Sequence, residues 1–141
     1  MNKILFLDID GVLHPSSEKN PSKYFSKVSY LTEGLSVNTC NIVISSSWRF
    51  HLSIDELKSR FPNSIKNLIV DVTGDPHIGK YSRYNEILSY LKSIDKPFMR
   101  WITLDDSVFE FPNKCENLIE CNPNTGLEIS EVKKLKEWLS S

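Results

Sequence analysis

A short apolar segment near the start of the chain ends abruptly in acidic residues, and this feature constrains the fold more than any other. Residues 3–9 have the composition of a buried strand, and Asp8 and Asp10 lie at its carboxyl end. A lone aspartate at this place would be interpreted as an ordinary polar residue of a loop. An Asp-x-Asp-Gly string directly after a buried strand, with Gly11 completing it, instead indicates a chemical site.

The rest of the chain alternates predicted strands with predicted helices. Further strands are expected at residues 42–44, 68–70, 98–104 and 118–119, and helices at residues 25–37, 53–61, 81–93 and 129–139. A Ser-x-x-Glu capping box from Ser53 to Glu56 marks one helix start, and Ser130 is expected to cap the last helix. Such alternation predicts an α/β fold, a three-layer α/β/α sandwich whose Rossmann-like sheet is mainly parallel and has helices on both faces.

Length and charge limit the possible classes of protein. A chain of 141 residues is the size of one domain, so residues 1–141 are expected to form a single unit. The 17 basic and 18 acidic residues leave a formal charge of −1, which argues against extended nucleic-acid binding. No apolar stretch near the start is long enough for a membrane span or a signal-peptide core, so we expect a cytoplasmic protein without a membrane anchor.

Polar side chains follow three of the predicted strands. Asp8 and Asp10 follow the first, Ser45 the second, and Asp105 with Asp106 a later one. In open parallel sheets, ligands bind at the carboxyl ends of the strands, so these groups are expected to converge. Two unit charges 4 Å apart repel by about 4 kcal/mol near a protein surface. A hard divalent cation such as Mg²⁺, which prefers oxygen ligands, resolves this repulsion.

Three strings resemble motifs of the haloacid dehalogenase (HAD) superfamily in its phosphatase branch. They are FLDIDGVL (residues 6–13), IVIS (residues 42–45) and ITLDD (residues 102–106). The longer strings SSSWR, RYNEIL and RWITLDD are similar to one small subgroup, the HAD domains of "Swiss Army knife" nucleic-acid repair proteins. The resemblance covers about residues 4–127.

The resemblance implies a role for each acid. Asp8 would attack phosphorus and form an aspartyl-phosphate, and Asp10 would act as general acid and then as general base. Gly11 would let the backbone turn beside Asp10. Mg²⁺ would bind the Asp8 carboxylate, the Asp10 carbonyl and Asp106. Asp105 would be a ligand through water or an orienting partner, and the order of Asp105 and Asp106 stays open.

Phosphate contacts and a cation complete the implied site. Ser45 would donate its hydroxyl and a nearby backbone N–H to a phosphoryl oxygen, with Ser46 and Ser47 as alternatives to it. A simple turn is the competing explanation for the three serines. The third motif requires one cation that offsets the charge of the nucleophile and the phosphoryl group. Lys80 and Arg83 compete for this role, and the subgroup string favours Arg83.

Three residues near these motifs are further candidates for contact with the substrate, and two of them have more than one interpretation. Trp48 could stack on a base or pack in the core, and Arg49 could hold a distal phosphate. His14 could touch the substrate from a flap or lie on the surface as an ordinary histidine.

Segment lengths bear on the substrate, because superfamily members often carry a cap domain inserted between motifs. Residues 12–41 and 50–79 already have to contain predicted elements, so neither leaves room for a cap. An open site suits an accessible phosphomonoester, and the subgroup points to a nucleic-acid end or a nucleotide.

Two other classes compete with a phosphatase: a receiver-like phosphoacceptor domain and a non-catalytic HAD-like binding module. A receiver needs an Asp after its third strand and a Lys at the end of its fifth. Lys96 precedes its strand and no Asp ends the strand at 42–44.

Overall fold

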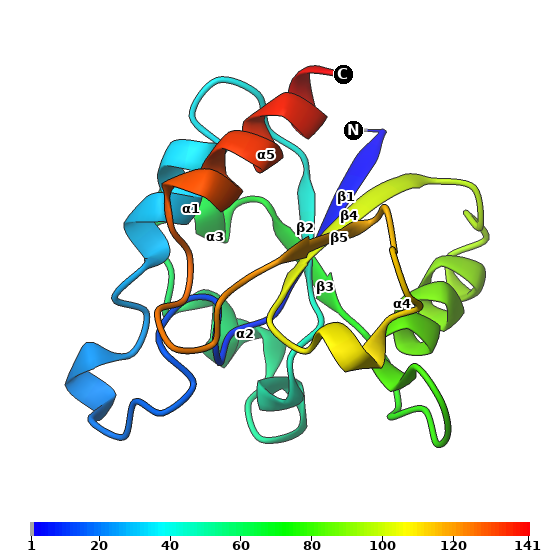
Figure 1. The fold of residues 1–141 in the computed structure, drawn as a ribbon, viewed down its shortest axis with the longest axis horizontal. Coiled ribbons are helices and arrows are strands. Elements are labelled where there is room, and N and C mark those ends of the chain that lie inside the picture. Colours follow the sequence, from blue (N-terminus) through cyan, green and yellow to red (C-terminus); the bar gives the residue numbers. More distant parts are fainter. Residues whose placement is uncertain (1) are drawn as a thin grey trace.

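The computed structural model describes residues 2–141, and a sheet of five parallel strands forms its centre (Figure 1). The strands lie in the order β3-β2-β1-β4-β5. Their bounds are β1 Lys3–Leu7, β2 Asn41–Ile44, β3 Ile69–Val72, β4 Arg100–Asp105 and β5 Leu118–Glu120. The first strand is therefore central and pairs with β2 on one side and β4 on the other.

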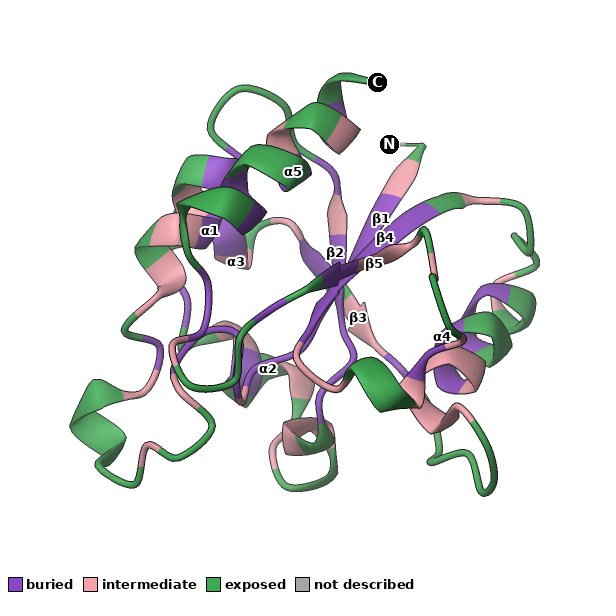
Figure 2. Cartoon of the chain, viewed as in Figure 1, coloured by how far each residue is buried: buried purple, intermediate pink, exposed green. Residues whose placement is uncertain are grey.

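Helices cover both faces of the sheet, which confirms the predicted three-layer α/β/α architecture. Along β1, Leu5 and Leu7 join one buried cluster, and Ile4 and Phe6 join the other. Figure 2 shows the central strands buried and the outward sides of the helices exposed. The helices that contribute buried residues to the first cluster are α1 (Val28–Gly34), α2 (Ile54–Lys58), α3 (Asn63–Lys66) and α5 (Ile129–Ser140). The helix that covers the second cluster is α4 (Ser82–Ser93).

Aromatic packing holds α4 against its face. The Phe6 ring meets Tyr90 of α4 and Trp101 of β4 edge to face, with ring centroids 5.8 and 5.7 Å apart. Each such pair adds about 0.5–1.5 kcal/mol beyond the area it buries. Because α4 also carries Arg83, this packing fixes the position of a charged residue beside the sheet.

Two helices differ from their predicted limits. The helix expected at residues 25–37 is only α1, because Phe25 has φ 65°, a left-handed conformation that an α-helix does not accept. Ser130 is not the cap of α5, which was a wrong prediction. Glu128 occupies the cap position, and its N–H donates to Glu131 Oε1 at 3.1 Å, whereas Ser130 lies inside the first turn and its hydroxyl donates to Glu131.

The capping box at Ser53 is confirmed, since the Glu56 N–H donates to Ser53 Oγ at 3.1 Å and the Ser53 N–H donates to Glu56 Oε1 at 3.0 Å. The helix α2 that it starts ends at Lys58, short of residue 61. The short helix α3 and three 3₁₀ turns were not predicted, because segments of three or four residues carry no periodic signal. The turns are Pro21–Lys23, Ser47–Phe50 and Val108–Glu110.

The connections between strands contain no cap domain within residues 2–141. The segment from β1 to β2 holds only a 3₁₀ turn and α1, and the segment from β2 to α4 holds a 3₁₀ turn, α2, α3 and β3. In this same part of the chain, no helix is both long and apolar enough to cross a bilayer. The carboxyl ends of β1 and β4 are left uncovered by any inserted domain.

The chain changes direction across the sheet between β1 and β4. From β1 it builds β2 and β3 on one side, and then returns to build β4 and β5 on the other. In open α/β sheets such a switch point leaves a crevice at the carboxyl ends of the two strands, where ligands bind. Asp8 directly follows β1, and Asp105 ends β4.

Candidate active site

Three carboxylates meet where β1 and β4 end. Asp8, Asp105 and Asp106 each offer an oxygen, and these oxygens lie within 4.8 Å of one another. Asp8 and Asp105 are buried, at 5% and 0% exposure, whereas Asp106 is half-buried. The sequence prediction that strand-end acids converge therefore holds for these three.

Burial and mutual repulsion disfavour the charged forms of these acids. Desolvation and the neighbouring Asp105 raise the pKa of Asp8 well above its ordinary value, against the attraction of Arg83. Desolvation raises the pKa of Asp105 as well, although Arg83 and the Ser107 N–H oppose the shift. The cluster therefore carries more negative charge than its protein surroundings compensate.

Arg83 is the cation of this cluster. Its Nη1 lies 2.7 Å from Asp105 Oδ2 and 3.5 Å from Asp8 Oδ1. Burial alone would lower the pKa of the guanidinium, but Asp105 and Asp8 outweigh it and raise the pKa above its usual range. Lys80, the competing candidate, is exposed and its Nζ lies 5.0 Å from the centre of the Tyr81 ring. The structure thus brings Arg83, and not Lys80, to the carboxylates.

Asp105 and Asp106 have different surroundings. Both oxygens of Asp105 already have protein partners, because Oδ2 binds Arg83 and Oδ1 accepts the Ser107 N–H at 2.9 Å. Among residues 2–141, the side chain of Asp106 makes one hydrogen bond, a long contact of 3.5 Å from the Ser107 hydroxyl to Oδ1. Asp106 is the less engaged of the two and the better placed to bind a ligand directly.

Gly11 allows Asp106 to lie where it does. The residue has φ 78°, and a Cβ added there would lie 2.1 Å from Asp106 Oδ2. The Gly11 N–H donates to the His14 carbonyl at 2.9 Å, which closes a tight loop after Asp10. Glycine is therefore required at this position both for backbone conformation and for space.

The serines after β2 have distinct environments. Ser45 Oγ is buried and has no hydrogen-bond partner among residues 2–141, while the Ser45 N–H already donates to the Leu7 carbonyl at 2.9 Å. Ser46 Oγ accepts the Trp48 N–H at 3.2 Å and so caps a 3₁₀ turn, and Ser47 is exposed. Of the three hydroxyls, the one on Ser45 is buried and still unpaired.

His14 and Trp48 both contact Asp10, which the sequence reasoning missed. His14 Nε2 lies 2.8 Å from Asp10 Oδ1, and Trp48 Nε1 donates to Asp10 Oδ2 at 3.0 Å. Of the two interpretations of His14, the surface histidine is wrong, because His14 is 1% exposed, and the contact with substrate stays a prediction. The half-buried Trp48 ring packs against Tyr24 and Phe25. The four-residue spacing of Asp10 and His14 was visible, but only the loop geometry gives it meaning.

Arg49 is held inside the protein. Its Nη2 lies 2.9 Å from Glu86 Oε1, its Nη1 donates to the Ser46 carbonyl at 2.9 Å, and its Nε donates to the Gly74 carbonyl at 3.1 Å. Burial is the main cause of its lowered pKa. A distal-phosphate role for Arg49 stays a prediction, and such a role would require these contacts to change.

Glu86 was not predicted from the sequence. It is buried on α4, and its Oε2 accepts the His77 N–H at 3.1 Å in addition to the ion pair with Arg49. It also lies one helical turn after Arg83, whose Nε is 3.8 Å from Glu86 Oε1. The available signal was the i, i+3 spacing of Arg83 and Glu86, which places an acid and a base on the same face of a helix.

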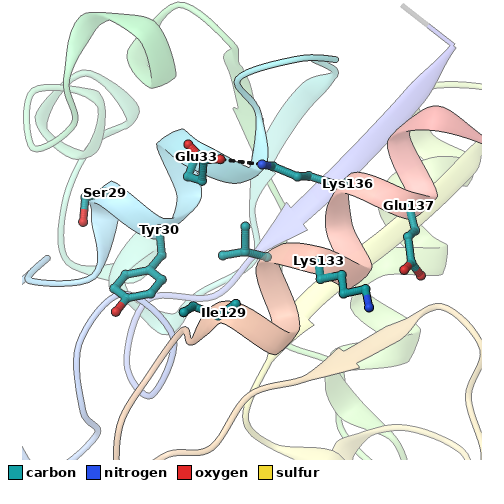
Figure 3. A pocket seen from close by; sticks show the side chains of 8 residues that line it. Ser29, Tyr30, Glu33, Ile129, Lys133, Lys136 and Glu137 are labelled. Atoms are coloured by element: carbon teal, nitrogen blue, oxygen red, sulfur yellow. Dashed lines mark hydrogen bonds and ion pairs between the residues drawn. The ribbon is translucent and has the colours of Figure 1, made fainter.

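A separate groove lies between α1 and α5 (Figure 3). It has a volume of about 850 Å³, and Tyr30, Ile129 and Lys133 are among its lining residues. In Figure 3, Glu33 of α1 reaches across to Lys136 of α5, and these side chains form an ion pair. None of the acidic-cluster residues lines this groove, so it is distinct from the candidate active site.

A parallel sheet with an Asp-x-Asp-Gly turn after its central strand and an Asp-Asp pair after the neighbouring one defines a HAD-like domain. The family model described as the HAD domain in Swiss Army Knife RNA repair proteins matches residues 4–132, and the chain belongs to this family. Searches of curated proteins and of solved structures find no match. The family is thus the one predicted from the motifs.

Proposed function

We propose that this chain is a Mg²⁺-dependent phosphohydrolase that cleaves a phosphomonoester through an aspartyl-phosphate on Asp8. The observation that carries the proposal is the environment of Asp8 at the end of β1. Its carboxylate lies 3.5 Å from Arg83 and within 4.8 Å of oxygens of Asp105 and Asp106. A buried nucleophile, a fixed cation and a set of oxygen ligands are the groups that phosphoryl transfer requires.

The residues present fit a divalent cation. Three carboxylates and one guanidinium leave two negative charges without a counterion when all are ionised. Burial first, and the charge of Asp105 second, raise the pKa of Asp8 in this setting. All the candidate ligands are hard oxygens, as Mg²⁺ prefers. Asp8, Asp106 and the Asp10 carbonyl would hold the ion, and Asp105 would orient Arg83. When bound, Mg²⁺ neutralises charge on the transferring phosphoryl group.

Each protein group has a defined task in the proposed reaction. Asp8 attacks phosphorus, and Asp10 gives a proton to the leaving oxygen. Asp10 then takes a proton from the water that cleaves the aspartyl-phosphate, which releases inorganic phosphate and restores Asp8. Arg83 offsets the charge of Asp8 and the phosphoryl oxygens. The unpaired, buried hydroxyl of Ser45 supports its role as a donor to one of those oxygens.

The family and the surface support a nucleic-acid end or a nucleotide as the substrate. The family is named for RNA repair proteins, and the chain has no cap domain within residues 2–141. Phe50 and Phe109 follow β2 and β4 and are 49% and 79% exposed. Exposed aromatic rings can stack on bases at about 1–3 kcal/mol each. The formal charge of −1 favours contact with a terminal phosphate over an extended binding surface.

A phosphate-release assay tests this function. We expect turnover of oligonucleotides with a 3′ or 5′ phosphate in Mg²⁺, and its loss in EDTA. Ca²⁺ should support turnover poorly, because it tolerates looser coordination than Mg²⁺ does. Nucleotides and sugar phosphates are the comparison substrates. Preference for sugar phosphates would overturn the nucleic-acid assignment, and no release from any phosphomonoester would overturn the hydrolase itself.

A further inference from the structure

We propose that His14 and Trp48 are positioning residues for Asp10, and that their two N–H groups hold its carboxylate facing the leaving oxygen. The inference deepens the proposed function and rests on it, because it assumes that Asp10 transfers the proton. Neither residue touches the phosphoryl group in this proposal. Both act through Asp10.

The contacts account for both oxygens of the Asp10 carboxylate. His14 Nε2 lies 2.8 Å from Oδ1, and the Trp48 indole N–H donates to Oδ2 at 3.0 Å. The two donors come from different parts of the chain, since His14 closes the loop after β1 and Trp48 lies in the 3₁₀ turn after β2. Two donors on two oxygens fix the plane of the carboxylate as well as its position.

The backbone determines which nitrogen of His14 is the donor. The Phe25 N–H donates to His14 Nδ1 at 3.2 Å, so Nδ1 acts as an acceptor and carries no hydrogen. The ring hydrogen is then on Nε2, which points at Asp10. His14 is 1% exposed, so water does not compete for either contact. The left-handed conformation of Phe25 accompanies this arrangement.

Aromatic packing keeps both donors in place. The His14 ring stacks on Tyr24 with centroids 4.7 Å apart and an interplanar angle of 21°. The Trp48 ring meets Tyr24 and Phe25 edge to face, at 5.6 and 5.5 Å. The Asp10 side chain is 50% exposed, so without its two donors it would be free to occupy other rotamers. This aromatic packing therefore orients a half-exposed carboxylate.

Two substitutions of His14 separate its two hydrogen bonds. In His14→Asn, the side-chain oxygen can replace Nδ1 as acceptor for the Phe25 N–H, but the amide is too short to reach Asp10. In His14→Gln, the longer amide can donate to Asp10 Oδ1 in place of Nε2. Trp48→Phe keeps an aromatic ring and removes only the N–H. The three variants thus remove or restore the donors while keeping most of the packing.

The rate on two kinds of leaving group distinguishes positioning from a merely structural role. A good aryl leaving group needs little protonation, whereas an alkyl leaving group needs the general acid. We expect His14→Asn and Trp48→Phe to lower kcat/KM about 10–100-fold for an alkyl phosphate and much less for an aryl phosphate. His14→Gln should recover most of the alkyl rate. An equal loss on both substrates, or no recovery with Gln, would overturn the proposal.

A second measurement does not depend on turnover. In the ¹⁵N-labelled chain, Asp10→Ala should shift the indole N–H resonance of Trp48 and leave those of Trp101 and Trp138 in place. The His14 ring nitrogens should report the tautomer with hydrogen on Nε2. An unmoved Trp48 resonance or the other tautomer would overturn the contacts. A different outcome is wild-type protein that hydrolyses neither the alkyl nor the aryl phosphate. That result would overturn the proposed function and the positioning role that rests on it, even if the spectra showed the contacts of His14 and Trp48 with Asp10.

Discussion

Asp8→Asn should abolish turnover while leaving the chain folded. An amide at this position cannot attack phosphorus, so we expect phosphate release to fall by at least about 10³-fold. Asn has nearly the shape of Asp and can still accept the Ile9 N–H that Asp8 Oδ1 accepts at 2.8 Å. The loss should therefore appear in kcat and not in the fold.

The same variant makes a signed prediction about stability in EDTA. Because desolvation and Asp105 raise the pKa of Asp8 in the folded chain, its ionised form reduces stability at any pH above the raised value. The penalty disappears below about pH 4, where the carboxyl is protonated in both states. Asp8→Asn should thus unfold at a higher temperature than wild type near neutral pH, and the difference should vanish toward pH 4.

Phosphate release in Mg²⁺ and thermal unfolding at several pH values in EDTA check both parts. Asp55→Asn on α2 is the matched control, because Asp55 is exposed and lies outside the acidic cluster. It should retain wild-type turnover. Full activity in Asp8→Asn would remove Asp8 from the nucleophile role.

Arg83→Met should cost both activity and stability. The guanidinium is only 12% exposed and is the cation that faces Asp8 and Asp105. Removing one partner of a buried ion pair typically costs about 3–5 kcal/mol, because it leaves the other charge uncompensated. Loss of a fixed cation at the phosphoryl group should also lower kcat by roughly 10²–10³-fold.

The stability loss in Arg83→Met should depend on pH in a defined direction. Arg83 lowers the pKa of both Asp8 and Asp105 against the effect of burial, so without it both pKa values rise further in the folded chain. Raised carboxyl pKa values make stability fall as pH rises above about 4. The difference in unfolding free energy between wild type and Arg83→Met should therefore be small in acid and large near neutral pH.

Urea unfolding at acid and neutral pH, together with phosphate release, measures these effects. Arg83→Lys keeps the charge but not the planar fork, and should recover part of the stability. Lys80→Met should change neither property. A catalytic loss with Lys80→Met equal to that of Arg83→Met would transfer the third-motif role to Lys80.

The fold class and the convergence of acids were predictable from the sequence, because both follow from regular backbone geometry. Strand and helix periodicity along the chain predicted the parallel sheet, and parallel strands place their carboxyl ends at one edge. Asp8, Asp105 and Asp106 meet for that reason. The choice between Lys80 and Arg83 as the cation required the structure, because it depends on the position of α4. That position is fixed by the packing of Tyr90 against Phe6, which also contacts Trp101.

The contacts made by loops could not be predicted in the same way. The loop after β1 turns back through Gly11 at φ 78°, and Phe25 adopts φ 65°. These conformations bring His14 under Tyr24 and against Asp10, which no periodic pattern encodes. The partnership of Arg49 with Glu86 joins residues 37 positions apart. Such pairs depend on the tertiary arrangement and not on local sequence.

The central claim is that a phosphoryl group is transferred to Asp8, and trapping that group tests it most directly. Asp10→Asn should still accept phosphate from an aryl phosphate, since a good leaving group needs no acid, but should hydrolyse the aspartyl-phosphate slowly. Acid-quenched protein, digested and analysed by mass spectrometry, should carry one phosphoryl group on Asp8. Phosphate on another residue, or none while wild type turns over the same substrate, would contradict the account.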